Sequence, residues 1–393
     1  MVVKWRQQFA LDLPATSHGC IWIHACSVGE VASVVPLIRS LRNEGHPVHL
    51  TVVTATGFAH AERLLNGTTI SYLPWDIPGT MSRLIKKLDP ALLLLTETEF
   101  WPGMLKACRK LNIPVIGINT RISDRSFPGY LRSSFLWRRW LKPVSLFLAQ
   151  SNLDAERLIA IGVDADRVKV AGNMKYAIDP PEVEATSLRQ KLDASESRPI
   201  LIVASTHDDE ESRILDMLPK WLALKPDLLT VLIPRHPRRF DAVAEQIRQR
   251  GYHLSRWSML GIEKPEQLLL VDAMGVLVGL FAIADLVIIG GSLVEIGGHN
   301  PLEAAICGRG VVTGPHVQNF RAIMDDMAHN NAAILARNDH EMCEAVSRLI
   351  SHPDELKELH AQATSFMADR TQVLPRILEA IKPWLPESVR SDT

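Results

Sequence analysis

Five cysteines in 393 residues, with no pair in C-x-x-C spacing, are too few and too scattered for a disulfide framework or a structural zinc site. A reducing compartment suits such a chain. The absence of G-x-G-x-x-G and G-x-x-x-x-G-K-[ST] motifs disfavours a dehydrogenase and a P-loop ATPase. No segment approaches the roughly 18 apolar residues that span a bilayer. The first ten residues include Lys4 and Arg6 but lead into no apolar core, so no signal peptide is expected.

The formal net charge is only -1, but the charged residues are unevenly distributed along the chain. Residues 1–175 hold 21 Lys+Arg against 13 Asp+Glu, and the remainder holds 22 against 31. A basic first half suits an anionic partner such as a phosphorylated lipid, a membrane surface or nucleic acid, although chance and solubility could produce the same asymmetry. Within it, Phe135 to Lys142 mixes tryptophans with cations. This pattern fits an interfacial helix and equally a core-facing helix with a solvated basic side.

What is present is an alternation of apolar strands and amphipathic helices, which predicts α/β domains with mostly parallel sheets. The length exceeds what one core usually supports, so two similar domains facing across a cleft are expected. The predicted boundaries are 1–176 for the first domain, 177–199 for a linker and 200–393 for the second domain, whose last helices are candidates for crossing back. The predicted strands are CIWIHA, HLTVVTA, TISYLP, ALLLLTE, IPVIGIN, SLFLAQ, ILIVAS, LLTVLIP, QLLLVD, LVIIGG and GVVTGP.

The most informative stretch is LVIIGGSLVEIGGHNPLEAA, residues 286–305, where a buried strand runs into glycine pairs and a helix start. Glycines there let backbone amides approach a ligand. Asn300 suits a helix N-cap and Pro301 suits the first helical position, so free amides would face an anion such as a nucleotide phosphate. Glu303 in the first turn can bind ribose hydroxyls. The alternative is a loop whose glycines only turn the chain.

Three motifs of the first half place polar side chains after predicted strands. HACSVGE ends in Glu30, a candidate general base whose alternative role is to compensate the helix dipole, with Ser27 or Gly29 as the cap. In TETEFWP, Glu97 and Glu99 alternate if the strand continues, so at most one enters the cleft, and Glu99 could orient a substrate or a catalytic group. INTRISDRS offers cations and hydroxyls for a phosphate or carboxylate, although it could be a solvated turn. The predicted acceptor-binding residues are Ser27, Gly29, Arg121, Ser123 and Arg125.

The second half carries the predicted nucleotide site. ASTHDDEE offers Ser205 and Thr206 as helix caps, PRHP holds Arg235 for a phosphate or sugar carboxylate, and VDAMG could offer backbone groups to a base. No metal site is expected, because His207, His236, His299 and His316 lack H-x-x-x-H spacing and suit hydrogen bonding or capping better. The predicted nucleotide-binding residues are Ser205, Thr206, Arg235, His236, Met274, Gly275, Gly291, Ser292, Asn300 and Glu303.

These motifs, together with AGNMKY and TGPHVQNF and in this order, closely resemble the Kdo transferases of lipopolysaccharide synthesis (Kdo is 3-deoxy-D-manno-octulosonic acid). The resemblance runs from about Ile21 to Phe320. It implies a GT-B fold and an inverting transfer of Kdo from CMP-Kdo to a tetraacylated lipid A precursor, with no metal and no cofactor. It makes Glu30 the general base and Glu99 its support. Arg235, the Gly291-Ser292 turn, Asn300 and Glu303 would hold CMP, with Glu303 on the ribose.

The resemblance also implies the partners and the location. They are CMP-Kdo, a phosphorylated lipid A precursor rather than nucleic acid, and the cytoplasmic face of the inner membrane of a Gram-negative bacterium. The apolar N-terminal anchor usual in the family is missing here, which suggests truncation or surface attachment. Gly103 and Val276 stand where asparagine and glutamate are common. The remaining alternatives are a GT-B enzyme that uses a UDP-sugar and a non-catalytic glycolipid-binding protein of the same fold.

Overall fold

The computed structural model describes residues 2–13, 18–77, 79–178, 185–192, 198–260 and 265–387. The chain forms two compact units, Met1–Ala177 with Arg370–Thr393, and Ile178–Asp369. Within the predicted linker, residues 179–184 and 193–197 lie outside the described residues, while Ala185–Leu192 form helix α9. Over the described ranges, no helix has both the length and the apolar character needed to cross a bilayer.

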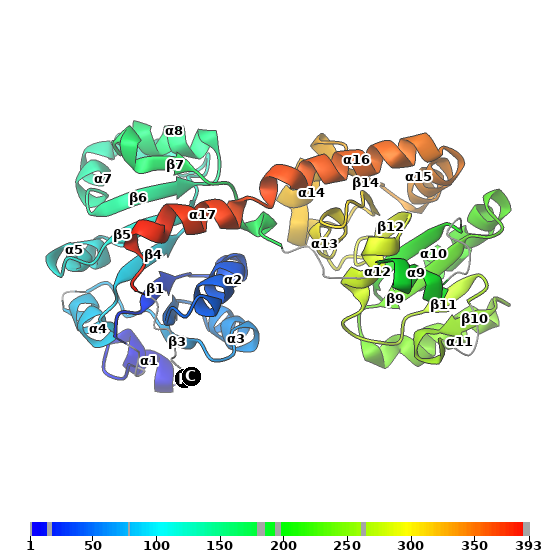
Figure 1. Cartoon of the computed structure of the whole chain (residues 1–393), viewed down its shortest axis with the longest axis horizontal. Coiled ribbons are helices and arrows are strands. Elements are labelled where there is room, and N and C mark those ends of the chain that lie inside the picture. The colour runs from blue at the N-terminus through cyan, green and yellow to red at the C-terminus, as the bar shows by residue number, and fades with distance from the viewer. Residues whose placement is uncertain are drawn as a thin grey trace. The chain divides into compact units, whose positions relative to one another are not determined.

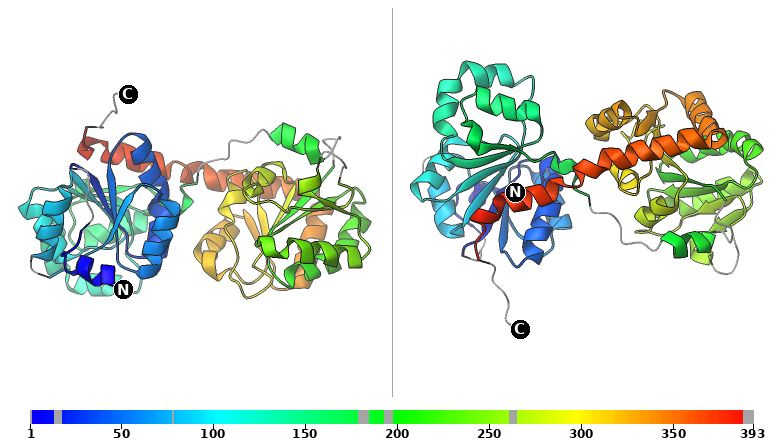
Figure 2. Two further views of the ribbon diagram at one scale, coloured as in Figure 1. Left: turned by 90° about the horizontal axis from the view of Figure 1, so that it is seen from below. Right: turned by 45° about the horizontal axis from the view of Figure 1, so that its top comes forward.

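The first unit is built on a seven-stranded parallel sheet in the order β3-β2-β1-β4-β5-β6-β7. Helices cover both faces of this sheet (Figure 2), so its central strands are continuous apolar runs such as LLLLT. The strands are β1 (Ile21–His24), β2 (Val48–Val52), β3 (Thr69–Tyr72), β4 (Leu92–Thr96), β5 (Val115–Thr120), β6 (Val144–Ala149) and β7 (Val168–Val170). The helices are α1 (Val2–Gln8), α2 (Val28–Asn43), α3 (Ala55–Leu64), α4 (Thr80–Leu88), α5 (Pro102–Lys110), α6 (Phe127–Arg132), α7 (Ser134–Trp140), α8 (Asn152–Ala160) and α17 (Val373–Ile381), with 3₁₀ turns η1 (Ala165–Arg167), η2 (Met174–Tyr176) and η6 (Lys382–Trp384).

The second unit repeats this architecture with a seven-stranded parallel sheet in the order β10-β11-β9-β8-β12-β13-β14. Its strands are β8 (Ile200–Thr206), β9 (Leu229–Pro234), β10 (Leu254–Arg256), β11 (Leu268–Leu270), β12 (Leu286–Ile289), β13 (Val311–Thr313) and β14 (Ala333–Leu335). Its helices are α9 (Ala185–Leu192), α10 (Glu210–Leu224), α11 (Phe240–Gln249), α12 (Leu277–Ile283), α13 (Leu302–Ala305), α14 (Arg321–His329), α15 (Asp339–Ser351) and α16 (Pro353–Arg370), with 3₁₀ turns η3 (Pro237–Arg239), η4 (Trp257–Met259) and η5 (Gln318–Phe320).

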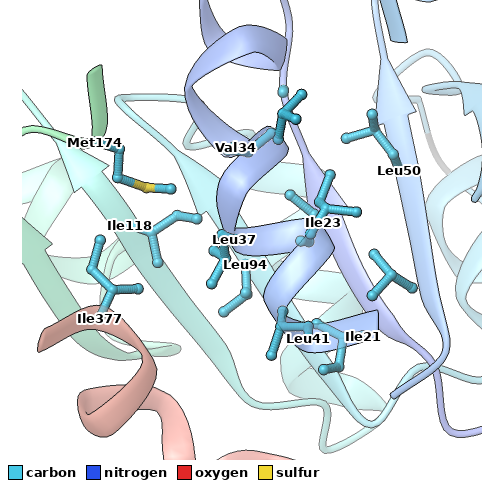
Figure 3. Packing of buried hydrophobic residues seen from close by; sticks show 14 of the residues in the cluster. Ile21, Ile23, Val34, Leu37, Leu41, Leu50, Leu94, Ile118, Met174 and Ile377 are labelled. Carbon is cyan, nitrogen blue, oxygen red and sulfur yellow. The ribbon is translucent and has the colours of Figure 1, made fainter. Parts of the chain in front are cut away.

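The C-terminal helix α17 is part of the first unit, although it is far from that unit in sequence (Figure 1). Its buried residues Val373, Ile377 and Ile381 belong to the same apolar cluster as Leu37 and Leu41 of α2. Figure 3 shows Ile377 beside Ile118 and Met174, with the side chains of α2 packed over the strands. This segment therefore completes the core of the first unit.

The α/β class and all the predicted strands are confirmed, within a few residues at their ends. The prediction missed β7, β10 and β14, which have three residues each and lie at sheet edges. The residues of β7 and β10 are partly exposed and include Lys169 and Arg256, so they lack the apolar run that marks a buried strand. Short edge strands of this kind are common because they limit edge-to-edge association.

In each sheet the chain starts at a central strand, extends to one side and then crosses back to extend to the other side. Ligands of open α/β sheets bind beyond the carboxyl ends of the two central strands at this reversal. In the first unit the reversal lies between β1 and β4, which pair in parallel. In the second unit it lies between β8 and β12. The topology therefore points to the segments after these four strands as the functional positions.

A buried histidine of the first sheet makes stability depend on pH. His49 contacts the hydroxyls of Thr69 (3.0 Å) and Ser71 (2.9 Å), and burial lowers its pKa from 6.5 to about 4. The unfolded chain binds the His49 proton more tightly than the folded chain does. The contribution of His49 to the free energy of unfolding is therefore complete above pH 6.5 and is lost as the pH falls towards 4. The shift corresponds to about 3 kcal/mol. Urea unfolding from pH 7 to 4 should show this loss, and His49→Gln should reduce it. The exposed control His253→Gln should leave this loss in place.

Candidate active site

The candidate site of the first unit lies after β1, where a helix cap holds Glu30. Ser27 is the N-cap of α2, and its hydroxyl accepts a hydrogen bond from the Glu30 amide (3.3 Å) and donates one to Glu30 Oε1 (2.9 Å). Glu30 Oε2 accepts a bond from the Cys26 amide (2.9 Å) and lies 2.8 Å from the Thr96 hydroxyl. That hydroxyl also lies 2.9 Å from the His24 carbonyl, and its one proton can go to only one of the two. The Glu30 carboxylate is therefore fixed in orientation and 8% exposed.

Two further carboxylates follow β4. The prediction that Glu97 and Glu99 alternate was wrong, because residues two apart on a strand point to the same face. The strand also ends at Thr96, and Glu97 takes a left-handed conformation (φ 49°). Burial and the charges of Glu30 and Glu99 raise the pKa of Glu97, while Lys175 and Arg121 lower it. Glu99 Oε2 accepts bonds from Cys26 Sγ (2.8 Å) and Trp101 Nε1 (2.9 Å). Both acids thus lie close to the Glu30 segment, and Glu97 is a candidate site residue that the alternation argument missed.

Some of the predicted acceptor-binding residues lie near Glu30 and Glu97. Gly29 is exposed, with open space around it except for the Ser27 hydroxyl at 4.0 Å from an added Cβ. Arg121 is exposed and interacts with Glu97, whereas the Ser123 hydroxyl is bonded to that of Ser126 (2.8 Å). Arg125 is exposed. Lys175 of η2, within the AGNMKY motif, was not predicted and adds a cation to the group around Glu97.

The candidate site of the second unit is a cavity of about 320 Å³ at the strand-order reversal of its sheet. Of the predicted nucleotide residues, four line it: Ser205, Arg235, Asn300 and Glu303. Its other walls are His299 and apolar residues: Ala204, Leu277, Phe281, Ile289 and Phe320. The combination of an arginine, a carboxylate and aromatic rings within one small cavity is typical of sites for charged organic ligands.

Glu303 and Asn300 lie where a short helix begins. The Asn300 side chain accepts a bond from the Leu302 amide (3.1 Å) and lies 3.3 Å from Glu303 Oε1. The N-cap position is occupied by Pro301, one residue later than predicted, so Asn300 precedes the cap and bonds to the first helical amide from there. Burial raises the pKa of Glu303, and the Asn300 bond and the Arg235 charge lower it. The helix α13 has only four residues, so the helix dipole expected at this point is small.

The Gly291-Ser292 turn differs most from the prediction. Its amides were expected to face a phosphate, but the amides of Gly291 (2.7 Å), Ser292 (3.0 Å) and Leu293 (2.9 Å) donate to the carboxylate of Glu210. Ser292 is fully buried, and its hydroxyl donates to the Ile289 carbonyl. Gly291 has φ 66°, and an added Cβ would lie 3.0 Å from the His299 ring. The amides of the turn are therefore already bonded to Glu210, and Gly291 packs against His299, which lines the cavity.

Other predicted nucleotide residues are also placed differently. Thr206 is fully buried at the end of β8 and donates to Glu211 (2.8 Å), so neither it nor Ser205 caps α10, whose N-cap is Asp209. Met274 and Gly275 lie before α12 and are not among the residues that line the cavity. The exposed His236 contacts the ring of His207 (5.4 Å between centroids).

A histidine pair closes one side of the cavity. His207 Nε2 lies 2.8 Å from His299 Nε2, so one ring donates and the other accepts. Burial, followed by the charges of His207, Arg235 and His236, lowers the pKa of His299 to about 4. His299 is therefore neutral at physiological pH and can serve as a hydrogen-bonding wall of the cavity.

Glu210 should matter more for stability than for any direct ligand contact. Replacing it by alanine leaves three buried amides without acceptors, and we expect the free energy of unfolding of the second unit to fall by roughly 3–6 kcal/mol. Urea denaturation measures this loss. The exposed control Glu245→Ala on α11 should change stability by less than about 1 kcal/mol. Equal stability of the two variants would contradict the structural role of Glu210.

Comparison with known proteins identifies the family of this chain. Residues 3–178 match the protein family described as 3-Deoxy-D-manno-octulosonic-acid transferase (kdotransferase). The 3-deoxy-D-manno-octulosonic acid transferase of Haemophilus influenzae is 32% identical over 94% of this chain and 88% of its own length. That of Bordetella pertussis is 33% identical over 95% of this chain and 89% of its own length. The chain belongs to the Kdo transferase family.

As a Kdo transferase the chain is a glycosyltransferase, and the resemblance found in its motifs is confirmed. A solved glycosyltransferase from Rickettsia africae is similar in structure, with a TM-score of 0.51, 15% identity and coverage of 95% of this chain and all of that chain. This likeness supports the GT-B fold alone. The family places the Kdo transferase in lipopolysaccharide synthesis.

Proposed function

We propose that this Kdo transferase transfers Kdo from CMP-Kdo to a hydroxyl of a tetraacylated lipid A precursor, with inversion at the anomeric carbon. The observation that carries the proposal is the cavity of the second unit, where Arg235, Asn300 and Glu303 lie opposite apolar and aromatic walls. Its polar side suits a phosphate and a ribose, and Phe281 and Phe320 suit the face of a base. Its volume lies at the lower end of that of small-ligand sites, which suits a nucleoside monophosphate.

The proposed reaction is a single displacement. Glu30 takes the proton of the acceptor hydroxyl, whose oxygen attacks the anomeric carbon of Kdo from the side opposite the phosphate. The bond from that carbon to the phosphate oxygen breaks, and CMP leaves with the bonding electrons. Arg235 stabilises the negative charge that develops on the phosphate. Glu99 holds the segment around Cys26, which in turn holds Glu30 by its amide. No step requires a metal.

The acceptor side is supported by cations on the first unit. Arg121 and Lys175 are exposed and interact with Glu97 near the base, and a phosphorylated glycolipid offers them anionic partners. A second set of cations, Lys106, Arg109 and Arg139, lines a separate cavity of about 360 Å³ together with Trp140. We assign this cavity to a lipid phosphate at the membrane surface.

The function is tested by incubating the purified chain with CMP-Kdo and a tetraacylated lipid A precursor and weighing the product. We expect a mass increase of one or more Kdo residues. The donor is tested separately by thermal unfolding, since a ligand stabilises the state it binds. CMP should raise the melting temperature and UDP should not. The reverse pattern would favour the UDP-sugar alternative, and stabilisation by CMP without product would favour a binding protein.

Membrane attachment at the cytoplasmic face of the inner membrane is proposed through α6 and α7. Phe135 is 72% exposed and Leu131 is 46% exposed, beside the exposed Arg138 and Arg139. Trp137, in contrast, is half-buried and packs against Tyr130 and Trp140, so it is a poorer candidate for insertion than the sequence indicated. Apolar side chains flanked by cations are typical of surfaces that bind anionic lipids.

Replacing Leu131 and Phe135 together by serine should weaken binding to vesicles that contain anionic lipid by at least tenfold, because each large side chain contributes up to about 2–3 kcal/mol when buried. Sedimentation with liposomes measures the effect. Leu153→Ser with Ile159→Ser on α8 removes two similarly exposed apolar side chains and serves as the control. Equal binding by both double variants would rule out α6 and α7 as the attachment surface.

A further inference from the structure

Three side chains with different donor atoms meet between the carboxyl ends of β1 and β4. They are His24, Cys26 and Glu99, and one nitrogen, sulfur and oxygen ligand atom from each all lie within 4.8 Å of one another. The proposed mechanism uses Glu99 only through Cys26, and it gives His24 no role. Nitrogen, thiolate sulfur and carboxylate oxygen together form a donor set that zinc accepts and that magnesium and calcium do not.

The imidazole is already oriented for a metal. His24 is fully buried, and its Nδ1 lies 2.9 Å from the Thr51 hydroxyl, which can donate or accept, and 3.1 Å from the Thr51 carbonyl, which can only accept a hydrogen bond. The tautomer with its proton on Nδ1 satisfies both contacts, and in it the lone pair of Nε2 faces Cys26 Sγ at 3.6 Å. A zinc-bound histidine almost always donates its second ring N–H to a carbonyl, carboxylate or water in this way, which fixes the tautomer and the ring plane.

The sulfur and the carboxylate are in direct contact. Cys26 Sγ donates to Glu99 Oε2 at 2.8 Å, and Trp101 Nε1 holds the same oxygen at 2.9 Å. An ion that enters this contact takes the place of the thiol proton, which is released to solvent, and bonds to the thiolate and the carboxylate. The two negative charges then balance a divalent cation. Cys26 and Glu99 are only partly buried, so a fourth position is open to water.

We propose that His24, Cys26 and Glu99 bind Zn²⁺ with a water as the fourth ligand. The ion acts as an inhibitor, and this second statement rests on the proposed function. Binding draws Glu99 and Cys26 to the metal, while the Cys26 amide is what holds Glu30 Oε2.

Cobalt(II) is the probe, because thiolate ligation gives an intense near-ultraviolet charge-transfer band that nitrogen and oxygen ligands do not give. Titrating the reduced full chain with Co²⁺ should produce this band at one equivalent, and Zn²⁺ should abolish it. Cys26→Ser should remove the band, and Glu99→Gln should weaken Co²⁺ binding by about 10–100-fold. The matched control Cys343→Ser changes another partly buried thiol and should keep the band. A band that is absent in the wild type, or that persists in Cys26→Ser, overturns the site.

A measurement on the wild type tests the site without relying on variants that could fail to fold. Zn²⁺ should slow alkylation of Cys26 by iodoacetamide at least tenfold, read by peptide mass spectrometry, and should leave Cys343 unprotected. Equal alkylation with and without zinc contradicts the proposal. In the transfer assay, zinc should lower the wild-type rate at least tenfold, while for Cys26→Ser the ratio of rates with and without zinc should approach one. If the chain transfers Kdo but gives no cobalt band, the metal site is rejected and the proposed function stands. If it gives the band but transfers no Kdo, the metal site stands and the proposed function is rejected.

Discussion

Replacing Glu30 by glutamine is expected to lower the rate of Kdo transfer by roughly 10²–10⁴-fold, the range in which general-base catalysis contributes. An amide cannot take a proton from the acceptor hydroxyl at neutral pH. The substitution preserves shape, and the surroundings tolerate it. The amide oxygen can accept from the Cys26 N–H as Oε2 does, and the amide nitrogen can donate to the Ser27 hydroxyl in place of Oε1. The loss should therefore appear in kcat, with an unchanged melting temperature and little change in KM for CMP-Kdo.

The control for this variant is Glu62→Gln, an exposed glutamate on α3 that should leave the rate unchanged. Glu97→Gln divides the two candidate bases, since burial and neighbouring carboxylates raise the pKa of Glu97 and so suit it to proton transfer. If Glu97→Gln stops the reaction and Glu30→Gln does not, the base is Glu97 and the assignment of Glu30 is wrong. If only Glu30→Gln stops the reaction, Glu30 is the base, and Glu97 acts only through its charge at the acceptor site.

The sequence predicted the parts of the fold that depend on local patterns. Buried strands such as β4 are apolar runs long enough to recognise, and Ser27, one of the two caps expected for α2, is its N-cap. The short edge strands carry no such pattern. The polar motifs that directly follow predicted strands were also expected to meet, because parallel strands of one sheet end at the same edge.

The parts that could not be predicted depend on partners far apart in the sequence. Glu210 occupies the amides of the Gly291 turn from 81 residues away, so glycines that look free in the sequence are already bonded. Cys26 meets Glu99 across 73 residues. Residue spacing predicts that an amide or thiol is near a strand end, but it does not show which side chain of another element reaches it. For the same reason the aromatic wall at Phe320 was missed, although it lies within a recognised motif.

Removing the Arg235 side chain should weaken donor binding more than any other single change in the second unit. Arg235 is exposed at the end of β9, lines the cavity, and acts electrostatically on both Glu303 and His299. A charge-assisted bond to a phosphate is worth about 1.5–3 kcal/mol, so Arg235→Ala should raise the dissociation constant for CMP by roughly 10–150-fold in calorimetry. Because negative charge grows on the phosphate as CMP leaves, kcat should fall as well, on the order of 10²-fold.

Two further variants separate charge from geometry. Arg235→Lys keeps the positive charge but loses the planar fork, so it should recover part of the binding and less of the rate. Arg238→Ala removes an exposed arginine from the neighbouring η3 turn and should change neither. If Arg235→Ala and Arg238→Ala bound CMP equally well, the phosphate would not lie against Arg235. The cavity of the second unit would then no longer be supported as the nucleotide site. Among the residues that line it in the described part of the chain, Arg235 is the one permanently charged cation.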